Sequence, residues 1–181
     1  MDTYIALLRG INVSGQKLIK MDALRDLFIN TGFQNVETYI QSGNIIFNYT
    51  KTEQKTLSKH IENRIHDNFG FEVPVIIRTL DDFKKIINRN PYPREDKIYF
   101  DTLHITFLSE TPAKENIIYA EEFNFEPDSF IVAEKEVYVY CPNGYGNTKI
   151  SNNFFESKLK VKATTRKLRT VKELIKIAGT V

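Results

Sequence analysis

Two short polar stretches in the first fifty residues carry side chains that could bind a ligand. The first, Arg9-Gly10-Ile11-Asn12-Val13, follows an apolar run, and its guanidinium group can hold a carboxylate or phosphate with two hydrogen bonds. The second, Gln41-Ser42-Gly43-Asn44, is more polar than a hairpin turn requires. We expect the two stretches to form one surface pocket, lined by Arg9, Asn12, Gln41, Ser42 and Asn44. The alternative is that these side chains only satisfy the hydrogen bonds of their turns.

A third candidate is the glycine-bearing stretch from Cys141 to Lys149, between an expected strand and an expected helix. Gly144 and Gly146 would let the backbone approach a ligand, and Lys149 together with a helix start near Ser151 favours an anion. The stretch lacks the Gly-Lys-Ser/Thr ending of a Walker loop and the third glycine of a dinucleotide fingerprint. It therefore predicts a general anion-binding loop.

Positive charge is concentrated near the C-terminus. Residues 149–176 hold nine Lys or Arg, including Arg166, and two acids, so this segment carries +7 whereas the whole chain carries +2. A basic segment on an acidic body indicates an anionic partner, which adds Arg166 to the candidate ligand-binding residues. The alternative is a solvated basic helix face.

Other chemistry is not indicated. His60, His66 and His104 stand in no metal-ligand spacing, and the single cysteine, Cys141, excludes an internal disulfide and a cysteine-pair zinc site. We therefore expect no metal and no cofactor, and we interpret Cys141 as a structural thiol at a strand end. No general base with an obvious partner stands out, so whether the protein is an enzyme is left open.

Nothing in the sequence indicates a membrane protein. No apolar run approaches the roughly 20 residues of a membrane helix, and the start of the chain has no basic and apolar signal pattern. With one cysteine, the protein is expected in the cytoplasm. The oligomeric state is left open.

Hydrophobic periodicity in the first half predicts the order β-α-β-β-α-β. The expected strands are 3–9, 36–40, 45–48 and 73–78, with helices beginning at Met21 and at a Thr52 cap. A trailing helix begins with a capping-box variant of Thr79 and Asp82.

The same order recurs in the second half. The expected strands are 103–108, 130–133, 136–141 and 160–164, and the expected helices follow caps at Thr111, Ser151 and Thr170, the last paired with Glu173. The best local match between the halves sets residues 78–86 beside residues 169–177.

These patterns predict an α+β fold of two duplicated ferredoxin-like units with antiparallel sheets. The expected boundaries are 1–90 for the first unit and its trailing helix, 91–102 for a linker, and 103–181 for the second unit and the C-terminal helix. Because each half has few apolar residues, we expect the halves to share one core or one continuous sheet.

The polar motifs resemble those of an uncharacterised bacterial family, domain-of-unknown-function family 1697. The resemblance rests on Arg9 to Val13 with Gly15, on Thr38 to Asn44, on Pro142 to Lys149 and on Ala163 to Arg166, and it spans essentially the whole chain. It implies a duplicated ferredoxin-like fold with strand order 4-1-3-2 and a site at these motifs, but no activity. The family's Asn-Trp-Asn-like run is replaced here by Lys167-Leu168-Arg169.

Three functions are compatible with the sequence. The first is binding of a phosphate-bearing ligand, either a nucleotide or a nucleic acid, whose bases could stack on Tyr138 and Tyr140. The second is a small enzyme that acts on an anionic metabolite. The third is an interaction scaffold whose polar motifs are purely structural.

Overall fold

A computed structural model describes residues 1–92 and 99–181. The chain divides into two compact units, one formed by Met1–Lys85 with Glu173–Val181 and the other by Ile86–Lys172. Half of the expected linker, 91–102, lies outside the described residues, and its last four residues form the short helix α4, Tyr99–Thr102. No helix in the described part of the chain is long and apolar enough to cross a membrane.

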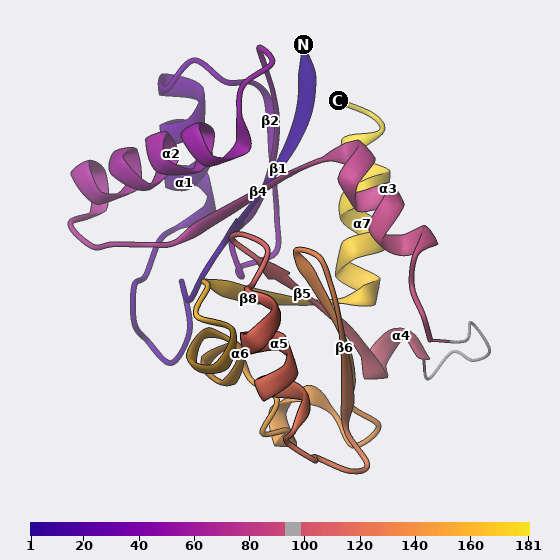
Figure 1. The fold of residues 1–181 in the computed structure, drawn as a ribbon. Helices are drawn as coiled ribbons and strands as arrows, with labels where there is room; N and C mark the ends of the chain where they lie inside the picture. Colours follow the sequence, from indigo (N-terminus) through magenta and orange to yellow (C-terminus); the bar gives the residue numbers. More distant parts are fainter. Residues whose placement is uncertain (93–98) are drawn as a thin grey trace. The chain divides into compact units, whose positions relative to one another are not determined.

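The first half folds in the predicted order (Figure 1). Its elements are β1 Asp2–Leu8, α1 Met21–Asn30, β2 Gln34–Tyr39, β3 Asn44–Tyr49, α2 Gln54–Phe69, β4 Val75–Thr79 and α3 Leu80–Asn88. The strands form a four-stranded sheet in the order β2-β3-β1-β4, with every neighbouring pair antiparallel. This is the expected ferredoxin-like arrangement.

One face of this sheet carries an apolar core cluster of the first unit. Tyr4, Ala6 and Leu8 alternate along β1 and share one buried cluster with Leu24 of α1 and Ile61 of α2. Figure 1 shows α1 and α2 together beside this sheet. Apolar residues recur about every 3.6 residues in the two helices and every two residues in the strand. Both patterns therefore place apolar side chains in the same cluster.

The second half repeats the order. Its elements are β5 Leu103–Leu108, α5 Lys114–Glu121, β6 Ser129–Ala133, β7 Glu136–Tyr140, a 3-10 turn η1 at Tyr145–Asn147, α6 Asn152–Leu159, β8 Ala163–Lys167 and α7 Leu168–Ala178. The sheet order β6-β7-β5-β8 is that of the first half, again fully antiparallel. The described strands therefore form two separate sheets and not one continuous sheet.

Strand register fixes which residues of the two halves correspond. Ile5 pairs with Arg78 in the first sheet, and Ile105 pairs with Arg166 in the second. Both arginines are buried, and each donates from Nη1 to the backbone oxygen of the residue before it, at 2.9 and 3.0 Å. The expected match of Arg78 with Arg169 is therefore wrong by three residues, because α7 begins two residues after Arg166.

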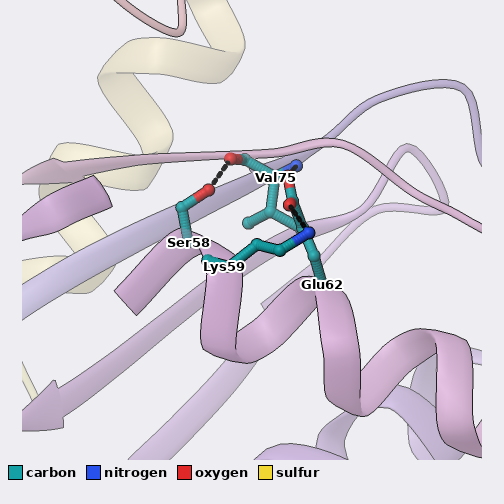
Figure 2. A network of polar contacts seen from close by, with 4 residues as sticks. All are labelled: Ser58, Lys59, Glu62 and Val75. Carbon is teal, nitrogen blue, oxygen red and sulfur yellow. Dashed lines mark hydrogen bonds and ion pairs between the residues drawn. The ribbon is translucent and has the colours of Figure 1, made fainter. Parts of the chain in front are cut away.

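A helix carboxylate binds the first amide of the last strand in both halves. Glu62 of α2 accepts a hydrogen bond from the Val75 backbone N–H at 2.9 Å, and Glu156 of α6 accepts one from the Ala163 N–H at 3.1 Å. Figure 2 shows the first of these, where Ser58 also donates to the Val75 oxygen. This repeated contact fixes how the second helix of each half lies against its sheet.

Helix starts follow the sequence only in part. Thr79 and Asp82 form the predicted reciprocal capping box, at 2.9 and 3.1 Å, and the Ser151 hydroxyl accepts from Phe154 N–H at 3.3 Å as predicted. The other three caps are wrong: α2 begins after Glu53, α5 after Ala113 and α7 at Leu168. Thr52 is instead held outside α2, because its N–H and oxygen both bind the Tyr4 hydroxyl.

Candidate functional site

The loop after β1 and the turn before β3 meet at one edge of the first sheet, as expected. The Leu8 N–H donates to the Gly43 oxygen at 2.8 Å, and the Asn12 side chain donates from Nδ2 to the Gln41 oxygen at 2.9 Å. The carboxyl end of β1 and the amino end of β3 lie together because these strands are antiparallel neighbours. The structure thus brings Asn12 and the turn together.

Asn12 uses both ends of its side-chain amide inside its own unit. Nδ2 also donates to the Ile19 oxygen at 3.0 Å, and Oδ1 accepts from the Ile19 N–H at 2.9 Å. Its backbone is left-handed, with φ +54°, a conformation that asparagine tolerates better than most residues. Asn12 therefore closes the 12–19 loop and joins it to the turn.

The turn itself is closely packed. Asn44 is fully buried, and its Nδ2 donates to the Tyr39 oxygen at 2.9 Å and to the Ser42 hydroxyl at 3.0 Å. Arg9 is half-buried with its N–H bound to the Pro74 oxygen, and Gln41 is exposed. The hydrogen bonds that the structural alternative requires are thus present for Asn12, Ser42 and Asn44. A ligand-binding role for the five residues stays a prediction.

The second unit contains a cavity of about 450 Å³ at the glycine-bearing loop. Its walls come from two segments, the α5–β6 connection and the residues after β7, and the lining is Asn124, Phe125, Glu126, Pro127, Asp128, Asn143, Asn147 and Lys149. The segment after β7 that contributes to this lining is the 143–149 loop, residues 143–149. The predicted Lys149 is exposed and lines the cavity.

Gly144 and Gly146 shape the 143–149 loop and do not line its cavity. Gly144 has φ +89° and stands directly before the η1 turn, where a residue with a side chain would be strained. Gly146 lies inside η1. Their predicted role as residues that let the backbone approach a ligand is not tested by this geometry.

Part of the positive charge of residues 149–176 is engaged in contacts within the second unit. Arg166 is 7% exposed, and its Nη1 donates to the Thr164 hydroxyl at 2.8 Å. Lys158 lies over the rings of Tyr119 and Phe123, and Arg169 pairs with Asp101 at 3.1 Å. Charge that is already engaged within the unit contributes less to an external partner, so the net +7 overstates the available positive surface.

Base stacking on Tyr138 is excluded in this conformation. The Tyr138 side chain is buried, and its hydroxyl donates to the Ile86 oxygen at 2.7 Å. Tyr140 stacks on Tyr92, with ring centroids 5.7 Å apart. The expected sheet-surface platform for nucleic acid is therefore not formed by these two residues.

Cys141 lies in the apolar core of the second unit. It is buried with Val137, Val139 and Phe155, and burial raises the pKa of its thiol to about 11. A thiol with such a pKa is protonated at neutral pH and is a poor nucleophile, which agrees with the structural interpretation. Within the described residues no group of three His, Cys, Asp or Glu could hold a metal ion.

Sequence reasoning missed a polar cluster in the second unit, which is built around the buried side chains of His104 and Thr106. We call it the His104 cluster: His104, Thr106, Tyr145, Asn152 and Thr165. The His104 ring stacks on the Tyr145 ring with centroids 4.7 Å apart. The signal was present in the sequence, because His104 and Thr106 occupy alternate positions in a strand whose other residues are apolar.

Hydrogen bonds order the rest of the His104 cluster. The Thr165 hydroxyl donates to Asn152 Oδ1 at 2.7 Å and accepts from the Tyr145 hydroxyl at 3.1 Å. The single hydroxyl proton of Thr165 is donated to Asn152. In the 2.7 Å contact between Thr106 and Thr165, Thr106 is therefore the donor. The Tyr145 and Thr106 hydroxyls thus both donate to Thr165, and Thr165 donates to Asn152.

Comparisons with known proteins give a family and a fold. A family model described as "Protein of unknown function (DUF1697)" matches residues 1–138. The chain is similar over 98% of its length to a solved structure, that of the conserved bacterial protein SP0830 from Streptococcus pneumoniae, with 98% of that chain covered, 22% identity and a TM-score of 0.74. At this identity the similarity shows the shared fold. No curated protein matches the chain.

Proposed function

The chain belongs to the DUF1697 family of proteins of unknown function, and we propose that it binds a small phosphate-bearing molecule of the nucleotide class in the cavity of its second unit. The observation that carries the proposal is the cavity of about 450 Å³, one wall of which is the 143–149 loop. Ligand pockets for small molecules are commonly 300–1,000 Å³ and combine apolar surface with a few polar groups.

Lys149 supplies the positively charged group that binds the phosphate in this proposal. Its ammonium is exposed at the cavity and offers three donors, and charge-assisted hydrogen bonds to phosphate are stronger than those between neutral groups. The N-cap of α6, Ser151, follows two residues later, so the positive end of that helix adds to the same preference. The phosphate would therefore occupy the Lys149 side of the cavity.

The acidic side chains of the lining select against a bare anion. Glu126 and Asp128 outnumber Lys149, so the lining as a whole does not attract inorganic phosphate by net charge. Carboxylates accept hydrogen bonds from sugar hydroxyls or amino groups, as an acidic residue does with the ribose of dinucleotides. A ligand with donors at one end and a phosphate at the other fits this distribution.

The remaining lining suits a flat, polar ring. Phe125 brings an aromatic face and is itself held edge-on by Phe154, with centroids 5.0 Å apart. The amides of Asn124 and Asn143 can donate and accept hydrogen bonds. Together with the sugar and phosphate positions, this favours a nucleoside monophosphate over a simple sugar phosphate.

A thermal-shift panel tests the proposal. Nucleoside monophosphates should raise the melting temperature more than ribose 5-phosphate, and orthophosphate should have the least effect. A ligand at about 100 times its dissociation constant stabilises the folded state by roughly 2.7 kcal/mol, which a melting curve resolves.

Two variants locate the effect. Lys149→Gln should abolish most of the shift, whereas Lys114→Gln, which removes an exposed lysine of α5 in the same unit, should preserve it. The absence of a shift with every nucleotide, or equal shifts in both variants, would leave the interaction scaffold as the better interpretation.

A further inference from the structure

A second cavity of about 340 Å³ adjoins the cavity at the 143–149 loop, which we call the first cavity. Four residues of the 124–128 segment line both cavities, so this segment is their common wall. Glu121, Phe123 and Phe130 line the second cavity and not the first. The volume lies at the lower end of the range for small-molecule sites.

The fold itself does not require the segment that builds the second cavity. The first half joins α1 to β2 through residues 31–33, whereas the second half joins α5 to β6 through residues 122–128, although the two sheets have the same strand order. The longer connection contributes Phe123, Glu126 and Asp128 to the lining. Because a shorter connection closes the same architecture, these residues have a reason beyond chain connectivity.

The charge of the second cavity is of one sign. Its lining holds three carboxylates, those of Glu121, Glu126 and Asp128, and no basic side chain. The first cavity differs because Lys149 lines it. Like charges around a hollow add to one local potential, so the second cavity attracts a cation and repels a phosphate.

Three phenylalanine rings complete the second cavity and share one support. Phe123, Phe125 and Phe130 line it, and each contacts the ring of Phe154 in α6, with centroids 5.6, 5.0 and 5.8 Å apart. Rings that are held in place before a ligand arrives lose little freedom on binding. Aromatic faces combined with carboxylates are the chemistry that recognises alkylammonium groups.

An ammonium group already lies on one of these rings. The Lys158 Nζ is 4.4 Å from the centroid of Phe123 and 4.9 Å from that of Tyr119. Lys158 is not part of the cavity lining, so it reaches this aromatic group from α6 outside the cavity. A cation on Phe123 is therefore a stable arrangement in this unit.

We propose that the second cavity binds an organic cation of the alkylammonium class, with the charged group against Phe123 and Phe130 and beside the Glu121 carboxylate. The inference goes beyond the proposed function and does not depend on it. None of these three residues lines the first cavity, and Lys149 does not line the second.

Titration of the full chain with choline, followed by NMR, tests the inference. Choline should shift the ring resonances of Phe123 and Phe130. Its neutral isostere 3,3-dimethylbutan-1-ol, which has the same shape without the charge, should bind at least about fivefold more weakly. Added salt should weaken choline and leave the isostere unchanged, because screening acts on the charged ligand alone.

Two variants should change the affinity for choline in opposite directions. Glu121→Gln removes a carboxylate of the lining and should weaken choline by about two- to fivefold. Lys158→Gln removes the ammonium that lies on Phe123 and should strengthen choline by about the same factor, which loss of folding could not cause. Glu115→Gln, at an exposed position of the same helix as Glu121, is the matched control and should leave the affinity unchanged.

A blocked lysine, Nα-acetyl-lysine methylamide, separates two sources of an alkylammonium group. Tighter binding of this probe than of choline assigns the site to a protein side chain, and the reverse order assigns it to a free amine. Equal affinities for choline and its neutral isostere, or no binding of either cation to the wild-type protein, would overturn the inference. Neither result would bear on nucleotide binding in the first cavity, which is measured separately.

Discussion

The side-chain amide of Asn12 donates to the backbone oxygen of Gln41 at 2.9 Å and so joins two loops that are 29 residues apart. The same amide group closes its own loop through two hydrogen bonds to Ile19. The two polar stretches of the first half, 9–13 and 41–44, are thus joined to each other by a hydrogen bond. This does not exclude a ligand at their exposed members, but it gives the residue types a sufficient structural reason.

Replacing Asn12 should therefore destabilise the protein whether or not a ligand is present. Asn12→Ala removes three hydrogen bonds and places alanine at φ +54°, so we expect the free energy of unfolding to fall by about 2–4 kcal/mol. Urea unfolding measures this. Asn63→Ala, at an exposed position of α2, should change the free energy by less than about 0.5 kcal/mol. An Asn12→Ala protein as stable as the wild type would show that Asn12 has no structural role.

Gly43 should tolerate substitution far less than Gly10, although both have positive φ values. A Cβ atom at Gly43 would lie 2.7 Å from the Leu8 Cβ and 2.7 Å from the Ile11 Cδ1, whereas one at Gly10 would meet nothing within 4 Å. Gly10→Ala should cost about 1–2 kcal/mol of backbone strain. Gly43→Ala should cost about 1–3 kcal/mol more, because the core must also make room.

Thermal unfolding of the two glycine variants compares them directly. A similar melting temperature for both would mean that the turn can move away from Leu8 and Ile11. Such a result would contradict the close packing of the 41–44 turn against the 9–15 loop.

Mild acid should weaken the fold through His104. The unfolded histidine binds a proton below its ordinary pKa of 6.5, whereas burial holds the folded pKa at about 4. Between these values the unfolded state binds more protons, so stability falls as the pH drops from 6.5 towards 4, by about 3 kcal/mol in total. Urea unfolding at pH 7 and pH 5 should show this loss in the wild type and a smaller loss in His104→Phe. An equal loss in both proteins would place the acid sensitivity elsewhere.

The sequence was sufficient for the element order because that order depends on local periodicity. The apolar alternation in β1 and the four-residue spacing of Leu57, Ile61 and Ile65 in α2 each predict one element. Thr79 and Asp82 were identifiable as a capping box because their contact is local. The strand order came from the family resemblance rather than from any pattern in the chain.

Features that depend on tertiary contacts were not predictable in the same way. Thr52 looks like a helix cap, but the Tyr4 hydroxyl, 48 residues away, holds it outside α2. The helix α7 begins directly after β8, so Thr170 lies within the first turn and cannot cap it. The His104 cluster draws its members from β5, β8, α6 and a loop, so no spacing in the sequence brings them together.

The central claim, a ligand in the cavity at Lys149, is tested most directly by calorimetric titration of the full chain with a nucleoside monophosphate. Wild-type protein and Lys114→Gln should bind one equivalent with the same affinity, and Lys149→Gln should bind about tenfold more weakly or worse, because a charge-assisted hydrogen bond to the phosphate is lost. No heat of binding in the wild type, or an unchanged affinity in Lys149→Gln, would contradict the claim.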